Sequence, residues 1–228
     1  MPMPPETIEP EWPAPFGVRA LITTRALGDV KDPGARVKLG ALLPSPPVWL
    51  KQVHGVTVVD AAAVSQGALP ESDASFTTER EVVCTVMAAD CMPVMLAAAD
   101  GSVVGAAHAG WRGLCAGVIE QTIERMRAPA SDVIAYLGPA IGPRVYEVGE
   151  EVRDAFLARD RMSATAFVAT RPGHWLLDLY CIARLRLAAV GVTRVHGGTH
   201  CTYSNPDLFF SFRRDKAMQR MAACIWRV

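Results

Sequence analysis

Residues 82–113 read VVCTVMAADCMPVMLAAADGSVVGAAHAGWRG, and this stretch decides the fold. Its β-branched and apolar runs predict two central strands, over 82–90 and 102–110. A glycine-rich turn follows. From residue 114 to 126 apolar residues then recur three and four positions apart, which predicts an amphipathic helix. A strand, a turn and a helix in this order are typical of layered α/β proteins.

The flanking sequence continues the alternation of strands and helices. We expect strands at 18–24, 48–55, 57–60, 133–138, 166–170 and 223–228, and helices at 148–158 and 177–191. The segment 25–47 is rich in glycine and proline and is predicted to be mainly loop. We therefore predict an α/β (or α+β) fold, a single layered domain over 16–228 with a mixed β-sheet flanked by helices. Residues 1–15, rich in proline and glutamate, are predicted to form an extended N-terminal arm.

The composition is that of a compact globular protein. Of 228 residues, 50% are hydrophobic and 20% are charged, far from the composition of disordered chains. The 23 Lys and Arg balance the 23 Asp and Glu, so we expect neither nucleic acid nor a membrane surface as a partner. No apolar run reaches the roughly 18 residues of a membrane span, and the N-terminal segment is acidic, unlike a leader peptide. We expect a cytoplasmic protein, monomeric or weakly dimeric, with mostly reduced cysteines.

Three potential metal ligands each lie at the end of an apolar, strand-like run: His54, Cys91 and His108. In open α/β sheets, functional sites gather at the carboxyl ends of strands, so these side chains are expected to converge. Two imidazoles and one thiolate match a catalytic zinc set that leaves a fourth position open. Taken singly, each residue has a simpler interpretation, because such histidines are often only hydrogen-bonded and such cysteines are often small buried apolar residues.

The motif HAGWRG, residues 108–113, is a candidate anion site. Its glycines let the backbone approach a ligand, and Arg112 supplies a planar cation before a helix, which suits phosphate or carboxylate. An equally good interpretation is a tight strand-to-helix turn in which Trp111 fills the core and Arg112 pairs with a surface acid.

Other candidates flank the three ligands. Asp90 precedes Cys91, and Gln52 lies two residues before His54, on the same side of the predicted strand, so either could orient a ligand or bind substrate. Near the C-terminus, residues 196–215 concentrate polar groups, among them Ser211 and Arg213, and could form a substrate wall. The alternative is that the phenylalanines of this segment pack in the core and its arginines are solvated.

Common catalytic motifs are missing from the sequence. It has no GxSxG elbow, P-loop, HExxH or GxGxxG motif, which removes the usual serine hydrolase, nucleoside triphosphatase, zincin and dinucleotide-binding interpretations. The function must therefore be sought in other motifs.

Six motifs occur in order along the chain: KQVHG (51–55), SDASFTT (72–78), AADCMPVML (88–96), AAHAGWRG (106–113), LGPAIGPRVYEVGEEV (137–152) and FFSFRRD (209–215). With them the chain resembles the YfiH-type laccase-domain family, described as multicopper polyphenol oxidases and as purine nucleoside phosphorylases. The resemblance spans roughly residues 18–226. It implies that His54, Cys91 and His108 are metal ligands and that the metal is zinc. Arg144 stands where relatives often have cysteine.

The resemblance implies phosphorolysis of purine nucleosides (adenosine, inosine, guanosine and methylthioadenosine), with adenosine deaminase activity in the same site. A metal that activates water suits attack at C6 of adenine. Phosphorolysis needs cations that place phosphate, for which Arg112 and Arg213 are the candidates. The alternatives are a copper-containing polyphenol oxidase, a hydrolase that edits peptidoglycan precursors, and a non-catalytic zinc-binding regulatory domain. Copper is the weaker expectation, because a trinuclear cluster would use up the remaining histidines.

Overall fold

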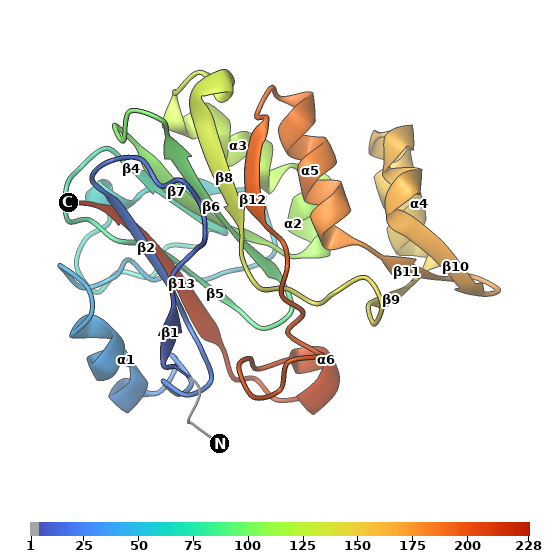
Figure 1. The fold of residues 1–228 in the computed structure, drawn as a ribbon, viewed down its shortest axis with the longest axis horizontal. Coiled ribbons are helices and arrows are strands. Elements are labelled where there is room, and N and C mark those ends of the chain that lie inside the picture. Colours follow the sequence, from blue (N-terminus) through green and yellow to red (C-terminus); the bar gives the residue numbers. More distant parts are fainter. Residues whose placement is uncertain (1–4) are drawn as a thin grey trace.

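The computed structural model describes residues 5–228 and has a mixed α/β architecture built on three sheets (Figure 1). The largest sheet has six strands in the order β12-β8-β6-β7-β4-β3. Its outer pairs, β12 with β8 and β3 with β4, are parallel, and the inner pairs are antiparallel. These strands are β3 (Val58–Asp60), β4 (Ala74–Thr77), β6 (Met92–Ala98), β7 (Val104–Ala109), β8 (Val133–Leu137) and β12 (Arg194–Gly197). The predicted mixed sheet flanked by helices is thereby confirmed.

A second sheet packs against one face of the first. It is antiparallel, in the order β1-β2-β13-β5, and consists of β1 (Thr7–Ile8), β2 (Val18–Thr23), β5 (Cys84–Ala88) and β13 (Met221–Arg227). Side chains alternate across β6, because successive residues of a strand point to opposite faces. Met95 and Ala97 pack toward this second sheet, whereas Val94 and Leu96 pack in the core on the helical side. Strand β6 is therefore buried on both faces.

Helices cover the other face of the six-stranded sheet. They are α2 (Trp111–Ala116), α3 (Val118–Met126) and α5 (Leu179–Ala189), whose apolar residues share one core with β6 and β8. The single helix predicted from residue 114 to 126 is wrong in one respect. Gly117 has a φ of +105° and ends α2, so two short helices form in its place. This left-handed conformation costs a residue with a Cβ about 1–2 kcal/mol, which explains the glycine.

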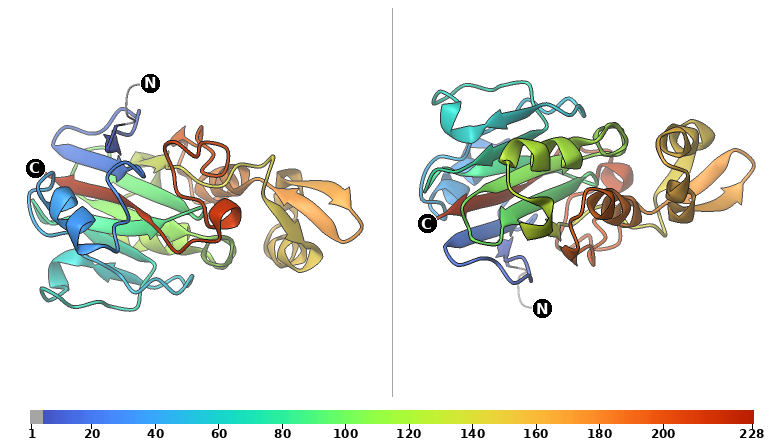
Figure 2. Two further views of the ribbon diagram at one scale, coloured as in Figure 1. Left: turned by 90° about the horizontal axis from the view of Figure 1, so that it is seen from below. Right: turned by 90° about the horizontal axis from the view of Figure 1, so that it is seen from above.

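A third, small sheet projects from one end of the molecule (Figure 2). It has the order β10-β11-β9, made of β9 (Glu147–Gly149), β10 (Phe167–Arg171) and β11 (His174–Leu177), and it packs with α4 (Glu150–Arg159). The remaining helices are α1 (Pro33–Gly40), α6 (Phe212–Asp215) and the short 3₁₀ turns Ala61–Ala63, Ala130–Asp132 and Arg161–Ala166.

One local prediction is wrong. Residues 48–55 form no strand: Val48 and Lys51 make only isolated bridges, and the segment turns sharply at His54, whose φ is +62°. The segment 25–47 is mainly loop, as predicted, and contains the short helix α1, which Pro33 starts at a position where its missing N–H is not needed. Strand β6 inside the opening stretch was not predicted as a separate element.

The N-terminal arm is partly described. Thr7 and Ile8 pair with β2, and the ring of Trp12 lies 6.0 Å from that of Tyr136, so this portion of the arm lies along the sheet. Residues 1–4 of the predicted arm lie outside the described residues. The division into an arm of 1–15 and a domain of 16–228 stays a prediction.

Among residues 5–228, every helix is too short or too polar to cross a bilayer.

Candidate metal centre

His54, Cys91 and His108 converge on one point, as predicted. Their potential ligand atoms all lie within 4.8 Å of one another, and His54 Nε2 is 3.7 Å from Cys91 Sγ. The two imidazole rings meet edge to face, with their centres 4.9 Å apart. Imidazole and thiolate are donors that zinc and copper both accept, so the donor set fits a metal ion of this class.

The three side chains reach this point by different routes. His108 is the penultimate residue of β7, and Cys91 lies in the tight turn between β5 and β6. His54 comes from an irregular loop, so the expectation that all three follow strand ends is wrong for this residue. Convergence therefore depends on a group that fixes the His54 loop next to β7.

That group is the carboxylate of Asp73, which lies just before β4 and is completely buried. Its Oδ1 accepts hydrogen bonds from His54 N at 2.9 Å and from His108 Nδ1 at 2.8 Å. Its Oδ2 accepts from Val53 N at 3.0 Å and from Gly55 N at 2.7 Å. The sequence analysis missed Asp73, although an acidic residue entering a buried strand is itself an unusual pattern.

Gly110 gives the centre its space. A Cβ at this position would lie 2.7 Å from His54 Cδ2 and 2.9 Å from Cys91 Sγ, closer than real contacts allow. Gly113 has a similar role in the first turn of α2, where a Cβ would lie 2.9 Å from the carbonyl oxygen of Gly55. The glycines of HAGWRG therefore let α2 begin directly against the metal ligands.

Electrostatics couple the thiol and the imidazole in the metal-free protein. Burial alone would raise the pKa of Cys91, but His108 and His54 outweigh it through charge and hydrogen bonds, and the pKa falls to about 6. Burial alone would lower the pKa of His108, but the Cys91 thiolate and Asp73 raise it to about 9. For Asp73 the hydrogen bonds likewise outweigh burial, so its pKa is lowered. Near neutral pH this is a thiolate beside an imidazolium and a carboxylate, an arrangement ready to exchange its protons for a cation.

The centre borders a cleft of about 360 Å³, which His54 and Cys91 line and His108 does not. Both predicted arginines line it, and each rests on an aromatic ring. The guanidinium carbon of Arg112 is 4.5 Å from the ring centre of Trp111, and that of Arg213 is 5.1 Å from the ring centre of Tyr146. The full lining is His54, Ala89, Asp90, Cys91, Gly110, Trp111, Arg112, Ile141, Tyr146, Leu179, Phe212, Arg213, Met218 and Arg220.

Asp90 anchors the C-terminal wall of this cleft. Its Oδ1 accepts a hydrogen bond from Thr202 Oγ1 and its Oδ2 accepts one from Arg213 N, both at 2.6 Å. Arg213 Nη1 in turn donates to the Glu147 carbonyl at 2.8 Å. Phe212 and Arg213 of this segment line the cleft, and its role as a substrate wall stays a prediction. Its apolar alternative also holds in part, since Phe209 and Phe210 are buried.

Two predicted substrate residues are not among those that line the cleft. Gln52 donates from Nε2 to the Met87 carbonyl at 2.8 Å and accepts from Met87 N at 2.7 Å, so its amide pairs with β5 as a strand would. The prediction that Gln52 and His54 lie on the same face of a strand is wrong, because residues 48–55 form no strand. Ser211 is buried and caps α6, its Oγ accepting from Arg214 N at 3.2 Å.

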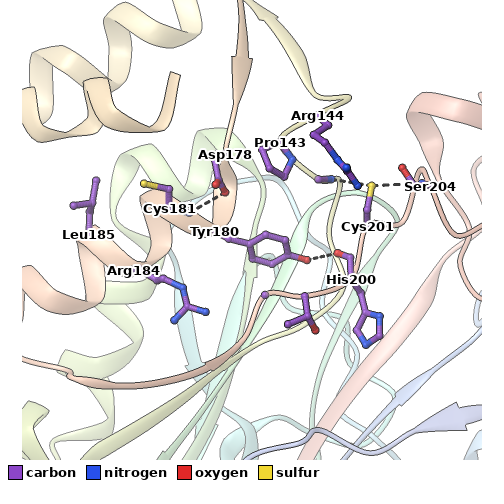
Figure 3. A pocket seen from close by; sticks show the side chains of 13 residues that line it. Pro143, Arg144, Asp178, Tyr180, Cys181, Arg184, Leu185, His200, Cys201 and Ser204 are labelled. Atoms are coloured by element: carbon purple, nitrogen blue, oxygen red, sulfur yellow. Dashed lines mark hydrogen bonds between the residues drawn. The ribbon is translucent and has the colours of Figure 1, made fainter. Parts of the chain in front are cut away.

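A second, larger cavity of about 620 Å³ lies between α5 and the segment that follows β12 (Figure 3). Arg144 and Cys201 line it, and Cys201 Sγ accepts hydrogen bonds from Gly142 N at 3.2 Å and Ser204 N at 3.4 Å. Burial alone would raise the pKa of this thiol, but the hydrogen bonds from Ser204 and Gly142 outweigh burial, so the pKa is lowered. Among residues 5–228, one cluster contains three or more potential metal ligands, and it consists of His54, Cys91 and His108. This second cavity therefore has no such cluster.

Comparisons with known proteins identify the family of this chain. The family model described as "Multi-copper polyphenol oxidoreductase laccase" matches residues 29–228. The chain is 44% identical to purine nucleoside phosphorylase PA4543 of Pseudomonas aeruginosa, over 96% of this chain and 97% of the relative. It is also 44% identical to purine nucleoside phosphorylase YfiH of Escherichia coli, over 97% and 98%.

Solved structures show the same fold. Protein NMB0706 of Neisseria meningitidis, described as a member of the DUF152 family, superposes with a TM-score of 0.93 at 42% identity, covering 98% of this chain and 99% of that one. YlmD of Geobacillus stearothermophilus superposes with a TM-score of 0.82 at 30% identity, covering 100% and 98%. The chain therefore belongs to the YfiH/DUF152 family of laccase-domain proteins.

Proposed function

We propose that this protein is a zinc-dependent purine nucleoside phosphorylase acting on adenosine, inosine, guanosine and methylthioadenosine. The observation that carries the proposal is the meeting of His54, Cys91 and buried His108 beside a cleft that His54 and Cys91 line together with Arg112 and Arg213. The names of the relatives from Pseudomonas aeruginosa and Escherichia coli support the same activity. All six cysteines are free thiols, which supports a reducing compartment such as the cytoplasm.

The reaction requires that an anion approach an electron-poor carbon. A phosphate oxygen forms a bond to C1 of the ribose, the bond from C1 to the purine nitrogen breaks, and the departing purine takes the electron pair and then a proton. Arg112 and Arg213 are suited to hold phosphate, because a guanidinium keeps its charge and offers paired donors. Each has an aromatic ring under it, which restricts the guanidinium before the anion arrives.

The cleft also offers surfaces for the base. Trp111 lines it from the start of α2, Tyr146 lines it from the residue before β9, and Phe212 and Met218 line it from the C-terminal segment. Phe212 and Met218 are 44% and 60% exposed, so their apolar surface is free to contact a ligand. A purine ring suits this surface, because aromatic and thioether side chains pack well on its faces.

The proposed metal would be held by His54 Nε2, Cys91 Sγ and His108 Nε2. Zinc bound in this way supplies a Lewis acid that polarises oxygen atoms or lowers the pKa of water. A set of three protein ligands is typical of catalytic zinc sites, whereas structural sites usually have four. This count supports adenosine deaminase activity in the same cleft as a second function, and it disfavours a regulatory domain with a purely structural zinc.

Copper is the alternative metal, favoured by the description of the family model. A multicopper oxidase needs a trinuclear cluster in addition to a Cys-His site. Within the described residues of the chain, His174 lies on β11, His196 lies on β12 and His200 follows β12, and none of them joins a second group of ligands. Zinc is therefore the stronger proposal, and oxidation of a polyphenol is the outcome that would favour copper.

The proposal is tested by incubating metal-analysed protein with adenosine, with and without phosphate. Adenine, ribose 1-phosphate and inosine are followed separately. We expect adenine and ribose 1-phosphate only when phosphate is present, with ribose 1-phosphate equal to adenine plus the hypoxanthine released from inosine, and we expect inosine in either case. His108→Ala should abolish both reactions, and His174→Ala, which changes a half-buried histidine of the small sheet outside the cleft, should abolish neither.

Other outcomes separate the remaining functions. Zinc-loaded protein that forms neither product would sink the phosphorylase proposal and move peptidoglycan-precursor editing or a non-catalytic role ahead. Oxygen consumption with a diphenol by copper-loaded protein, and none by zinc-loaded protein, would support the oxidase instead.

A further inference from the structure

Asp73 contacts both histidines of the proposed metal centre. Its side chain is 0% exposed, and its two oxygens accept four hydrogen bonds, two each. The donors come from two separate regions of the chain: the backbone of Val53, His54 and Gly55, and the ring of His108. The backbone of Asp73 adds a fifth contact, since its carbonyl accepts from His108 N at 2.7 Å.

We propose that Asp73 is the positioning residue of the metal centre, a single carboxylate that sets both the ring of His108 and the turn that carries His54. The inference rests on the proposed metal site and not on the reaction that the site catalyses. Neither histidine could be moved relative to the other without breaking a hydrogen bond to the same buried group.

The effect on His108 follows from hydrogen-bond chemistry. An ionised carboxylate can only accept, so the contact from His108 places a proton on Nδ1. The other ring nitrogen, Nε2, then faces Cys91 and is the one left to bind a metal. Carboxylates that hold a ligating histidine in this way fix its tautomer and orientation and raise its basicity.

The effect on His54 follows from backbone geometry. Its φ of +62° is a left-handed conformation that residues with a Cβ rarely adopt. Three consecutive amides, those of Val53, His54 and Gly55, point at the Asp73 carboxylate and hold this turn. The turn fixes where the side chain of His54 leaves the backbone, and the ring then meets the ring of His108 and Cys91 Sγ.

The test is Asp73→Asn, which keeps the shape but replaces one acceptor oxygen by a donor. Each oxygen of Asp73 serves two donors, so one pair of donors must then face an NH₂ group. We expect the affinity for Zn²⁺, measured by competition with a chromophoric chelator, to fall about 10- to 100-fold. The thiolate-to-metal absorption of the Co²⁺-loaded protein should also shift.

The matched control is Asp178→Asn, because Asp178 likewise accepts a backbone hydrogen bond, from Cys181 N at 3.0 Å, but outside the cleft. Its affinity should equal that of the wild type.

A purely structural role makes a different prediction. It would lower the melting temperature of the metal-free variant and leave the metal affinity and the Co²⁺ spectrum unchanged, and that result would overturn the proposal. If wild-type protein itself binds no metal, the proposed function fails first, so the two failures are distinguishable.

A measurement on wild-type protein covers the case in which Asp73→Asn does not fold. In zinc-loaded protein labelled with ¹⁵N-histidine, His108 should show a hydrogen-bonded proton on Nδ1 and none on Nε2. The opposite tautomer would overturn the proposal. The chain has only five histidines, so the spectrum can be assigned by single substitutions.

Discussion

At the scale of single residues, Cys91 is a thiol whose surroundings make it a thiolate before any metal arrives. His108 and His54 lower its pKa to about 6, against the opposing effect of burial. Cys84 and Cys224 show the opposite behaviour, because burial without a cationic neighbour raises the pKa of each to about 12. Thiolates are both the nucleophilic and the metal-binding form of cysteine, so these three residues should differ sharply in reactivity.

We predict that iodoacetamide modifies Cys91 in metal-free protein with a rate that rises with pH through a midpoint near 6. The midpoint is low because the thiolate is stabilised by imidazolium. Cys84 and Cys224 should stay unmodified at neutral pH, and zinc should protect Cys91. Mass spectrometry of the digested protein measures all three. A Cys91 midpoint near that of an ordinary thiol, about 8.5 to 9, would contradict the account.

Three of the four central residues of the site could be predicted from the sequence, and the fourth could not. His54, Cys91 and His108 stand out because they are ligand-type residues after apolar runs and because they fall in the motifs KQVHG, AADCMPVML and AAHAGWRG that carry the family resemblance. Asp73 does not, because its role depends on the approach of a loop 18 to 20 residues earlier and a strand 35 residues later. Such long-range contacts leave no local periodicity to read.

At the scale of elements, the turn from β7 into α2 determines how closely the metal ligands approach. Gly110 stands between His108 and the first residue of α2, and its missing side chain leaves room for the ring of His54 and the sulfur of Cys91. The segment that carries His54 cannot be a strand, because a turn with positive φ is needed to bring its ring to this place. The alternation of apolar residues in 48–55 does not reveal this turn, so the strand prediction failed there.

Gly110→Ala tests this close approach. The added Cβ would lie 2.7 Å from His54 Cδ2, so we expect Zn²⁺ to bind roughly tenfold more weakly or worse, with the fold retained. Chelator competition and circular dichroism measure the two effects. Gly34→Ala is the control, since a Cβ on that residue of α1 meets nothing within 4 Å. Equal zinc affinity in Gly110→Ala and wild type would contradict the proposed geometry.

Gly117→Ala tests the break between α2 and α3. The added Cβ would make ordinary contacts, the nearest at 3.5 Å from Arg159 Nη2, so the cost of the substitution is conformational only. At a φ of +105°, Gly117→Ala is expected to lower the free energy of unfolding by about 1–2 kcal/mol. Urea denaturation measures it. A variant as stable as wild type would mean that one continuous helix is allowed, as the periodicity alone suggested.

At the scale of the whole molecule, the chain closes on itself around the cleft. Strand β13 returns from the C-terminus to lie between β2 and β5, and α6 just before it brings Arg213 to the turn that carries Cys91. The alternation of strands and helices predicted the layered α/β class. Of the two strands predicted to be central in 82–113, β7 lies in the middle of the six-stranded sheet, whereas β5 is an edge strand of the second sheet, and the central strand β6 was not predicted. The division into three sheets could not be predicted, because it depends on which strands pair across long distances.

Asp90 joins the turn between β5 and β6 to the C-terminal segment, through its hydrogen bonds with Thr202 and Arg213 N. We expect Asp90→Ala to make the segment from Arg213 to Arg220 open more often, since a methyl group can accept from neither Thr202 Oγ1 nor Arg213 N. Loss of one such buried hydrogen bond costs about 1–3 kcal/mol. Limited trypsin digestion should then cut after Arg213, Arg214 or Lys216 faster than in wild type. Asp100→Ala, at an exposed turn, is the control, and equal cutting in both variants would contradict the link.

The central claim is that one metal ion held by His54, Cys91 and His108 makes this cleft a phosphorylase. The most direct test is to titrate metal-free protein with Zn²⁺ while following the phosphate-dependent release of adenine from adenosine. We expect the rate to rise linearly and level off at one zinc per chain, and Cys91→Ser to stay inactive at the same concentrations. Full activity in metal-free protein, or an equal rise in Cys91→Ser, would contradict the claim.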